Sequence, residues 1–192
     1  MRVLGLFTLG LAIWAQDYKA APGGAPPAQL TAGTRQLLQS RGARVVDPNG
    51  FLFCEVWLRA GPLSEGVSLP EAVERGSVPS GALVGAIRFL SPGADRSGRG
   101  FGPGVYTLRQ AEGDGVLMIK ADDDPGPEPA ALEELEPSSR KVTRGEAPAL
   151  LRMSRGAPGA APRLRITREG EWILEVTAGE APLALLIVGV AK

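Results

Sequence analysis

From residue 43 onward, apolar and polar side chains mostly alternate, which is the period-two pattern of half-buried strands. The clearest case is the segment 51–59, FLFCEVWLR, which is entered through the turn signal DPNG. That turn predicts a hairpin in which residues 43–46 pair with residues 51–59. The uniformly apolar positions of the segment are Leu52, Cys54, Val56 and Leu58. We therefore expect the face that carries Cys54 to point into the core.

Further strands follow at spacings set by turn residues. A nearly all-apolar run at 82–90, broken only by Arg88, predicts a strand in the middle of its sheet. A second hairpin is predicted from residues 105–109 and 116–121, because glycine-containing turns precede each of them. The remaining expected strands are 149–154, 164–167, 172–177 and 183–190. About nine strands with one apolar face each must close or stack, so the predicted fold is all-β, an antiparallel β-sandwich.

Helical spacing is confined to short stretches. Leu30, Leu37 and Leu38, followed by Gly42, predict a short amphipathic helix within residues 29–41. A helical turn is expected at 70–74, and a short helix at 130–136 that ends before a proline. The sandwich should therefore carry only one or two short helices.

The N-terminus has the three-part layout of a secretory signal peptide over its first 15 residues. Arg2 precedes an apolar run of about 12 residues, and the chain turns polar at Gln16. The run is too short to cross a membrane, which takes about 20 residues, so we expect cleavage after Ala15 and export to the periplasm or the medium. After cleavage no membrane span is expected. Residues 16–29, rich in proline, alanine and glycine, predict a flexible tether before a single domain at 30–192.

Composition removes several classes of function. The chain has no histidine, one cysteine, and 21 basic side chains against 21 acidic ones. Without histidine there is no Ser-His-Asp or Cys-His triad, no base beside Cys54, and no histidine-containing metal site. One cysteine excludes an internal disulfide. Balanced charge gives no footprint for nucleic acid, and we expect no cofactor.

The segment GADRSGRGFGPGVYTLR, with the upstream FCEVWLR and GALVGAIRFL, resembles a family of uncharacterised exported bacterial proteins with a P-G-x-Y-T-L-R hairpin strand. The resemblance covers about residues 44–155. Members of that family carry histidine at two points where this chain has Val116 and Ala147, so no metal or acid-base role is carried over. What the resemblance implies is a β-sandwich fold and export, with no known activity.

One candidate ligand-binding surface is the strand face that carries Glu55, Trp57 and Arg59. If this face is exposed, its aromatic rings could stack on a sugar or a proline while the charged pair orients the ligand. If it packs beneath the N-terminal helix, the aromatic rings are core and glutamate and arginine form a cross-sheet ion pair. We favour the packed alternative.

Two further candidate sites lie in loops. Arg96 and Arg109 flank the glycine-rich loop, whose backbone could approach an anion, although a solvated, flexible loop is the interpretation we favour. Asp122, Asp123 and Asp124 form an acidic turn of the kind that attracts Ca²⁺, but capping of the expected helix at 130–136 explains the same charges without an ion.

These patterns favour an exported, non-catalytic binding or interaction module for an unknown protein or glycan ligand. A small hydrolase that uses carboxylates and a structural component of an envelope complex remain the alternatives. The hydrolase needs two carboxylates that converge in a pocket, and the structural component needs a large flat apolar patch.

Overall fold

The computed structural model describes the backbone of residues 18–47, 49–63, 66–95, 100–111, 115–130, 151–155, 163–166, 172–178, 181–187 and 189–190. Side chains are described for residues 18–47, 49–63, 66–92, 101–111 and 115–130. The predicted leader at 1–15, the expected helix beyond residue 130 and Arg96 therefore lie outside the described residues.

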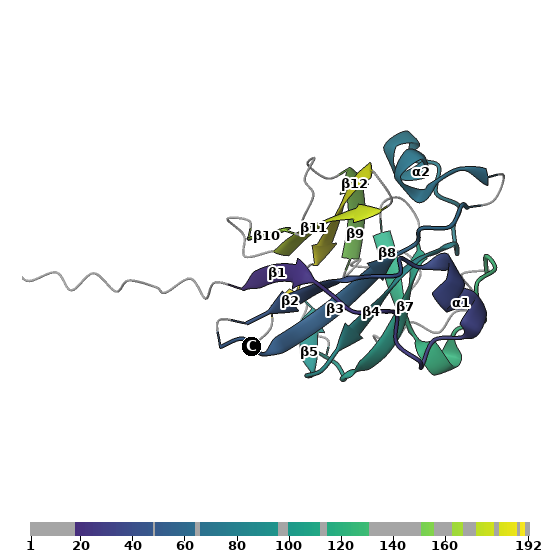
Figure 1. Cartoon of the computed structure of the whole chain (residues 1–192). Coiled ribbons are helices and arrows are strands. Elements are labelled where there is room, and N and C mark those ends of the chain that lie inside the picture. Colours follow the sequence, from purple (N-terminus) through teal and green to yellow (C-terminus); the bar gives the residue numbers. More distant parts are fainter. Residues whose placement is uncertain are drawn as a thin grey trace, which may run out of the picture.

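The protein is mostly β, and its strands pair antiparallel (Figure 1). Six strands with described side chains form one sheet in the order β1-β2-β3-β4-β7-β8. They are β1 Lys19–Pro22, β2 Ala43–Val46, β3 Leu52–Leu58, β4 Leu83–Phe89, β7 Gly104–Gln110 and β8 Gly115–Lys120. The predicted class and antiparallel pairing are confirmed for these strands.

Hydrogen bonding continues from β8 into the C-terminal part of the chain, in the order β9-β12-β11-β10. The bounds of these strands are β9 Leu151–Arg155, β10 Arg163–Ile166, β11 Trp172–Ala178 and β12 Ala181–Ile187. A small second sheet holds β5 Gly93–Asp95, β6 Gly100–Phe101 and β13 Gly189–Val190. A sandwich of nine strands is not confirmed, because the main strands join edge to edge in one sheet.

The two predicted hairpins are present. In the first, Val45 pairs with Cys54, and the turn is closed by Asp47, whose Oδ1 accepts hydrogen bonds from the backbone N–H of Asn49 at 2.9 Å and of Phe51 at 2.8 Å. Gly50 takes the positive φ of 85° that this turn requires. The second hairpin joins β7 to β8, and β4 lies between β3 and β7 as its apolar run predicts.

Two short helices flank the sheet, and each begins at a side-chain cap. Helix α1, Ala32–Leu37, begins at Thr31, whose hydroxyl accepts from the N–H of Thr34 at 3.1 Å. Helix α2, Leu69–Arg75, begins at Ser68 and ends at Gly76 in the left-handed conformation. Both lie where helical turns are expected. No helix in the described part of the chain is long and apolar enough to cross a membrane.

The tether predicted for residues 16–29 is wrong for its described part. Lys19–Pro22 forms strand β1, which pairs with β2, and the backbones of Gly23, Gly24 and Gly42 continue the contact beyond it. The backbones approach closely here, since a Cβ on Gly23 would lie 3.1 Å from the carbonyl oxygen of Gly42. Backbone pairing, which composition does not reveal, orders this segment.

The sheet has apolar residues on both faces. One face holds the larger core cluster, in which Cys54, Val56 and Leu58 are fully buried as predicted. The other face holds a smaller cluster around Trp57, covered by Leu30 and Leu38 from the N-terminal segment and α1. The face of Trp57 is therefore packed, as the favoured alternative expects.

Candidate functional site

Three neighbouring strands place Glu55, Arg88 and Val105 side by side, because Arg88 on β4 pairs in register with Glu55 on β3 and with Val105 on β7. The Nη2 group of Arg88 donates to the carboxylate of Glu55, and the guanidinium lies 6.0 Å from the centre of the Trp57 ring. The Glu55 side chain is 7% exposed and that of Arg88 is 34% exposed. Glu55 thus pairs across the sheet with Arg88, and not with Arg59, which is the arginine of the candidate face.

The other two members of the candidate face serve the fold. Trp57 is 1% exposed, and its indole N–H donates to the carbonyl oxygen of Gly24 at 2.8 Å. The Nε group of Arg59 donates to the carbonyl oxygens of Gly61 at 3.1 Å and Pro62 at 3.0 Å, which holds the loop after β3. An exposed aromatic platform is therefore absent from this face as far as side chains are described.

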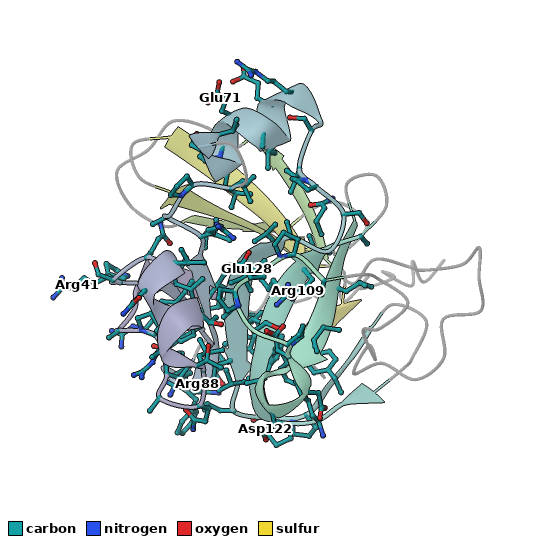
Figure 2. The ribbon with its side chains drawn as sticks, turned by 90° about the vertical axis from the view of Figure 1, so that its right-hand side faces the viewer. Arg41, Glu71, Arg88, Arg109, Asp122 and Glu128 are labelled. Atoms are coloured by element: carbon teal, nitrogen blue, oxygen red, sulfur yellow. The ribbon has the colours of Figure 1, made fainter. Side chains whose placement is uncertain are left out.

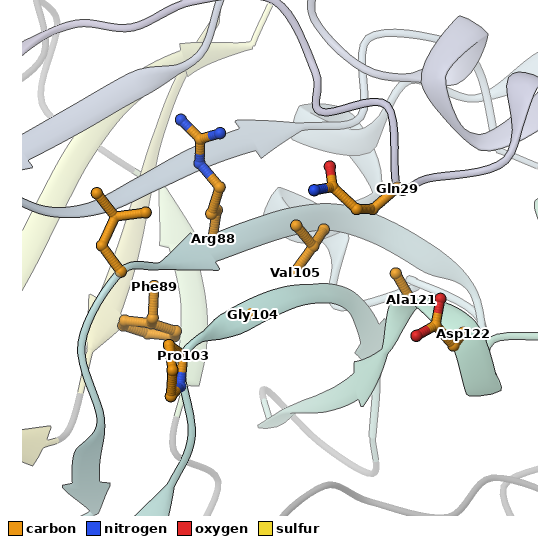
Figure 3. A pocket seen from close by; sticks show the side chains of 9 residues that line it. Gln29, Arg88, Phe89, Pro103, Gly104, Val105, Ala121 and Asp122 are labelled. Atoms are coloured by element: carbon orange, nitrogen blue, oxygen red, sulfur yellow. The ribbon is translucent and has the colours of Figure 1, made fainter.

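A pocket of about 450 Å³ opens beside Arg88, where the ends of β4 and β7 meet the N-terminal segment and the 3₁₀ turn η2, Ala121–Asp123 (Figure 3). Its polar side chains come from three separate segments and are those of Gln29, Arg88 and Asp122. Its apolar wall includes Leu90, Pro103 and Val105. Leu90 is 52% exposed, which places an apolar side chain at the rim.

The hydrogen bonding of Arg88 is incomplete. Among the described residues only its Nη2 group has a partner, and its Nε atom is buried with no acceptor. Buried polar groups are nearly always hydrogen-bonded, so an unpaired donor at a pocket calls for a functional explanation. Sequence reasoning missed Arg88 as a site residue, although a lone charge inside an apolar strand was the available signal.

Arg109 presents the opposite case, because it does not face the glycine-rich loop as an anion-binding residue would. It lies in β7, is fully buried, and meets the carboxylate of Asp124 with two hydrogen bonds, Nε to Oδ2 at 2.9 Å and Nη2 to Oδ1 at 2.8 Å. Its Nη1 group donates to the carbonyl oxygens of Gly81 at 2.9 Å and Glu128 at 2.7 Å (Figure 2). All three guanidinium nitrogens are engaged, so Arg109 holds the 121–130 segment against the sheet and has no donor left for a ligand.

The acidic turn does not act as one cluster. Asp124 turns inward to Arg109 and also accepts from the hydroxyl of Thr107, whereas Asp122 and Asp123 are exposed in η2. No group of three or more acidic or thiol side chains in the described ranges is arranged to hold a metal ion. The charge of Asp124 is used to pair a buried arginine, and Asp122 alone of the three lines the pocket.

Cys54 is buried in the larger core cluster. Burial, together with the neighbouring Glu55 carboxylate, raises the pKa of the Cys54 thiol well above its usual range. A thiol that stays protonated is a poor nucleophile, so Cys54 contributes packing and no chemistry.

No family model, no curated protein and no solved structure matches this chain significantly. The resemblance to exported bacterial proteins therefore stays a prediction, and the geometry of the site is what can indicate a function.

Proposed function

We propose that this protein is an exported binding module that holds a protein or glycan ligand without transforming it. The observation that carries the proposal is the pocket beside Arg88, where a partly exposed guanidinium lies against a concave, partly apolar wall. Such a combination of apolar surface and a few oriented polar groups is typical of ligand sites.

The hydrolase alternative is less well supported by the same residues. Acid-base hydrolysis needs two carboxylates that face one substrate bond. Asp122 is the one carboxylate among the described side chains that line the pocket, and Glu55 lies behind Arg88 as its ion-pair partner. The pocket thus offers groups that orient a ligand, and it lacks the convergent carboxylate pair.

A structural role in an envelope complex is also less well supported. That role calls for a broad apolar surface, and the large exposed apolar side chains in the described part of the protein are Phe51 and Leu90. Two side chains do not make a patch of the size that permanent partners bury.

Export and the completed sandwich belong to the same proposal. The leader-like first 15 residues support secretion to the periplasm or the medium. The two edge strands of the main sheet, β1 and β10, lie near each other (Figure 1), which supports a sheet that curls until its two halves stack as the predicted sandwich.

A glycan and peptide array, probed with the protein expressed from its native leader, tests this function. We expect a restricted set of ligands to be retained and recovered chemically unchanged. Incubation of the same protein with chromogenic esters and glycosides should release no product above the level given by heat-denatured protein. Turnover of either substrate class would contradict the proposal and favour the hydrolase.

A further inference from the structure

The residues around the pocket define what chemistry it can recognise, and this inference rests on the proposed binding function. We propose that the pocket beside Arg88 takes a neutral polyhydroxylated ligand, namely a sugar or a sugar unit of a glycan. Three features of the pocket favour such a ligand: the charge state of the Arg88–Glu55 pair, the pattern of hydrogen-bond donors and acceptors, and the apolar wall.

The charge of Arg88 is already neutralised by Glu55. A ligand carboxylate or phosphate placed on this guanidinium would lie close to the buried carboxylate of Glu55, and like charges at short range repel strongly where solvent is excluded. A hydroxyl oxygen can accept a hydrogen bond from the exposed part of the Arg88 guanidinium without that cost. The ion pair therefore favours a neutral acceptor over an anion.

The three polar side chains differ in what they offer. Arg88 can only donate, Asp122 when ionised can only accept, and Gln29 does both. A vicinal diol or triol matches this set, because each hydroxyl both donates and accepts. Gln29 and Asp122 are exposed and come from separate segments, so they can reach different hydroxyls of one ring (Figure 3).

The apolar wall supplies the remaining feature. Leu90, Pro103 and Val105 line the pocket between the polar groups. The C–H face of a sugar ring is apolar and would cover them, removing apolar surface from water. A volume of about 450 Å³ lies within the roughly 300–1,000 Å³ of small-molecule sites, which suits one or two sugar units better than a folded partner.

Calorimetric titration with a defined panel tests the proposal. The probes are glucose, N-acetylglucosamine, cellobiose and cellotetraose as neutral sugars, and glycine, glycylglycine and methyl phosphate as charged ligands. We expect binding by at least one sugar and none by the charged probes. Tighter binding of cellotetraose than of cellobiose would identify a glycan chain as the source, and equal binding would identify a free sugar.

The matched variants are Asp122→Asn and its neighbour Asp123→Asn. Both residues are exposed in η2, but only Asp122 lines the pocket, so the two variants should melt alike. For the sugar that binds, Asp122→Asn should weaken binding by about tenfold or more through the loss of a charge-assisted hydrogen bond. Asp123→Asn should change it by less than about twofold.

Three results would overturn the inference: binding of glycylglycine or methyl phosphate without any sugar, no binding by any probe, or equal losses in the two variants. A failure here is separable from a failure of the proposed function. If wild type and Asp122→Asn retain the array ligands equally, the proposed binding function stands, but the pocket is not the binding site. Substrate turnover would contradict the proposed binding function, whatever affinities the variants show.

Discussion

At the scale of single residues, two arginines on neighbouring strands differ in burial and in hydrogen bonding, and these differences give them different roles. Arg109 is fully buried with every guanidinium nitrogen bonded, whereas Arg88 is partly exposed, paired through Nη2 alone and left with a buried Nε that has no described acceptor. A fully hydrogen-bonded arginine stabilises its surroundings, whereas a partly exposed arginine beside a pocket can contact a ligand.

The Arg109–Asp124 pair should be essential for stability. Asp124→Asn keeps the shape of the side chain but leaves the buried guanidinium without a counter-charge, which should lower the free energy of unfolding by about 3–5 kcal/mol. Urea denaturation measures the loss. Asp123→Asn, at the preceding and exposed residue, should stay within about 0.5 kcal/mol of wild type, and an equally small loss in Asp124→Asn would contradict the stabilising role of the Arg109–Asp124 pair.

Cys54 should make stability depend on pH in the alkaline range. Burial raises its pKa in the folded protein, so the thiol ionises first in the unfolded chain, and stability falls as the pH rises above the unfolded value of about 8.5. From pH 7.5 to 9.5 the wild type should lose about 1 kcal/mol more than Cys54→Ala. Parallel curves for the two proteins, measured by urea denaturation, would show that the thiol is not shielded.

The sequence predicted the environment of Cys54 but not that of Arg88. Alternation alone puts Cys54 in step with Val56 and Leu58, and that pattern is local. The partner of Arg88 depends on which residue of β3 lies opposite it, and register between strands is set by tertiary pairing and turn geometry. For the same reason the pocket, which joins four separate segments, could not be located before the fold was known.

At the scale of elements, the strands and helices with local signals were predictable and β1 was not. The hairpins carry turn motifs and α2 carries a proline near its start and a glycine at its end. The segment KAAP of β1 has neither alternation nor β-branched residues, and it becomes a strand because its backbone pairs with β2. The content of proline, alanine and glycine predicted a tether here because amino-acid composition carries no information on strand pairing.

The packing of the chain before β2 against β3 should depend on Gly42. A Cβ at this position would lie 2.5 Å from the carbonyl oxygen of Val56 and 2.6 Å from the indole nitrogen of Trp57, so Gly42→Ala should cost roughly 1–3 kcal/mol. Gly24→Ala is the control, since a Cβ there meets nothing within 4 Å. Thermal melting distinguishes them, and equal melting temperatures would contradict the close approach.

At the scale of the whole molecule, the described strands form an antiparallel sheet that carries the pocket beside Arg88. The sheet places the pocket at one end of β4 and β7, while the Arg109–Asp124 pair fixes the segment that follows η2. The main described strands join in one sheet, so the predicted stacking of two sheets is not confirmed. Antiparallel alternation is common to both arrangements, so the pattern could not separate them.

Export is a separate prediction about the whole chain. Expressed with its native leader in a Gram-negative bacterium, the protein should leave the cytoplasm and begin at Gln16, which terminal sequencing detects. Leu9→Arg interrupts the apolar run and should hold the protein in the cytoplasm with its leader uncut. An intact Met1 on protein recovered from the periplasm would contradict a cleaved signal peptide.

The central claim is that ligand binds at Arg88 while Arg109 stays a structural anchor. The most direct measurement is NMR of the arginine side-chain Nε–H signals during titration with the sugar of the panel that binds most tightly. The Arg88 signal is identified by its loss in Arg88→Lys. We predict that the Arg88 signal shifts with the ligand concentration and that no other arginine Nε–H signal follows it. A ligand that binds by calorimetry and leaves the Arg88 signal unmoved would contradict the account.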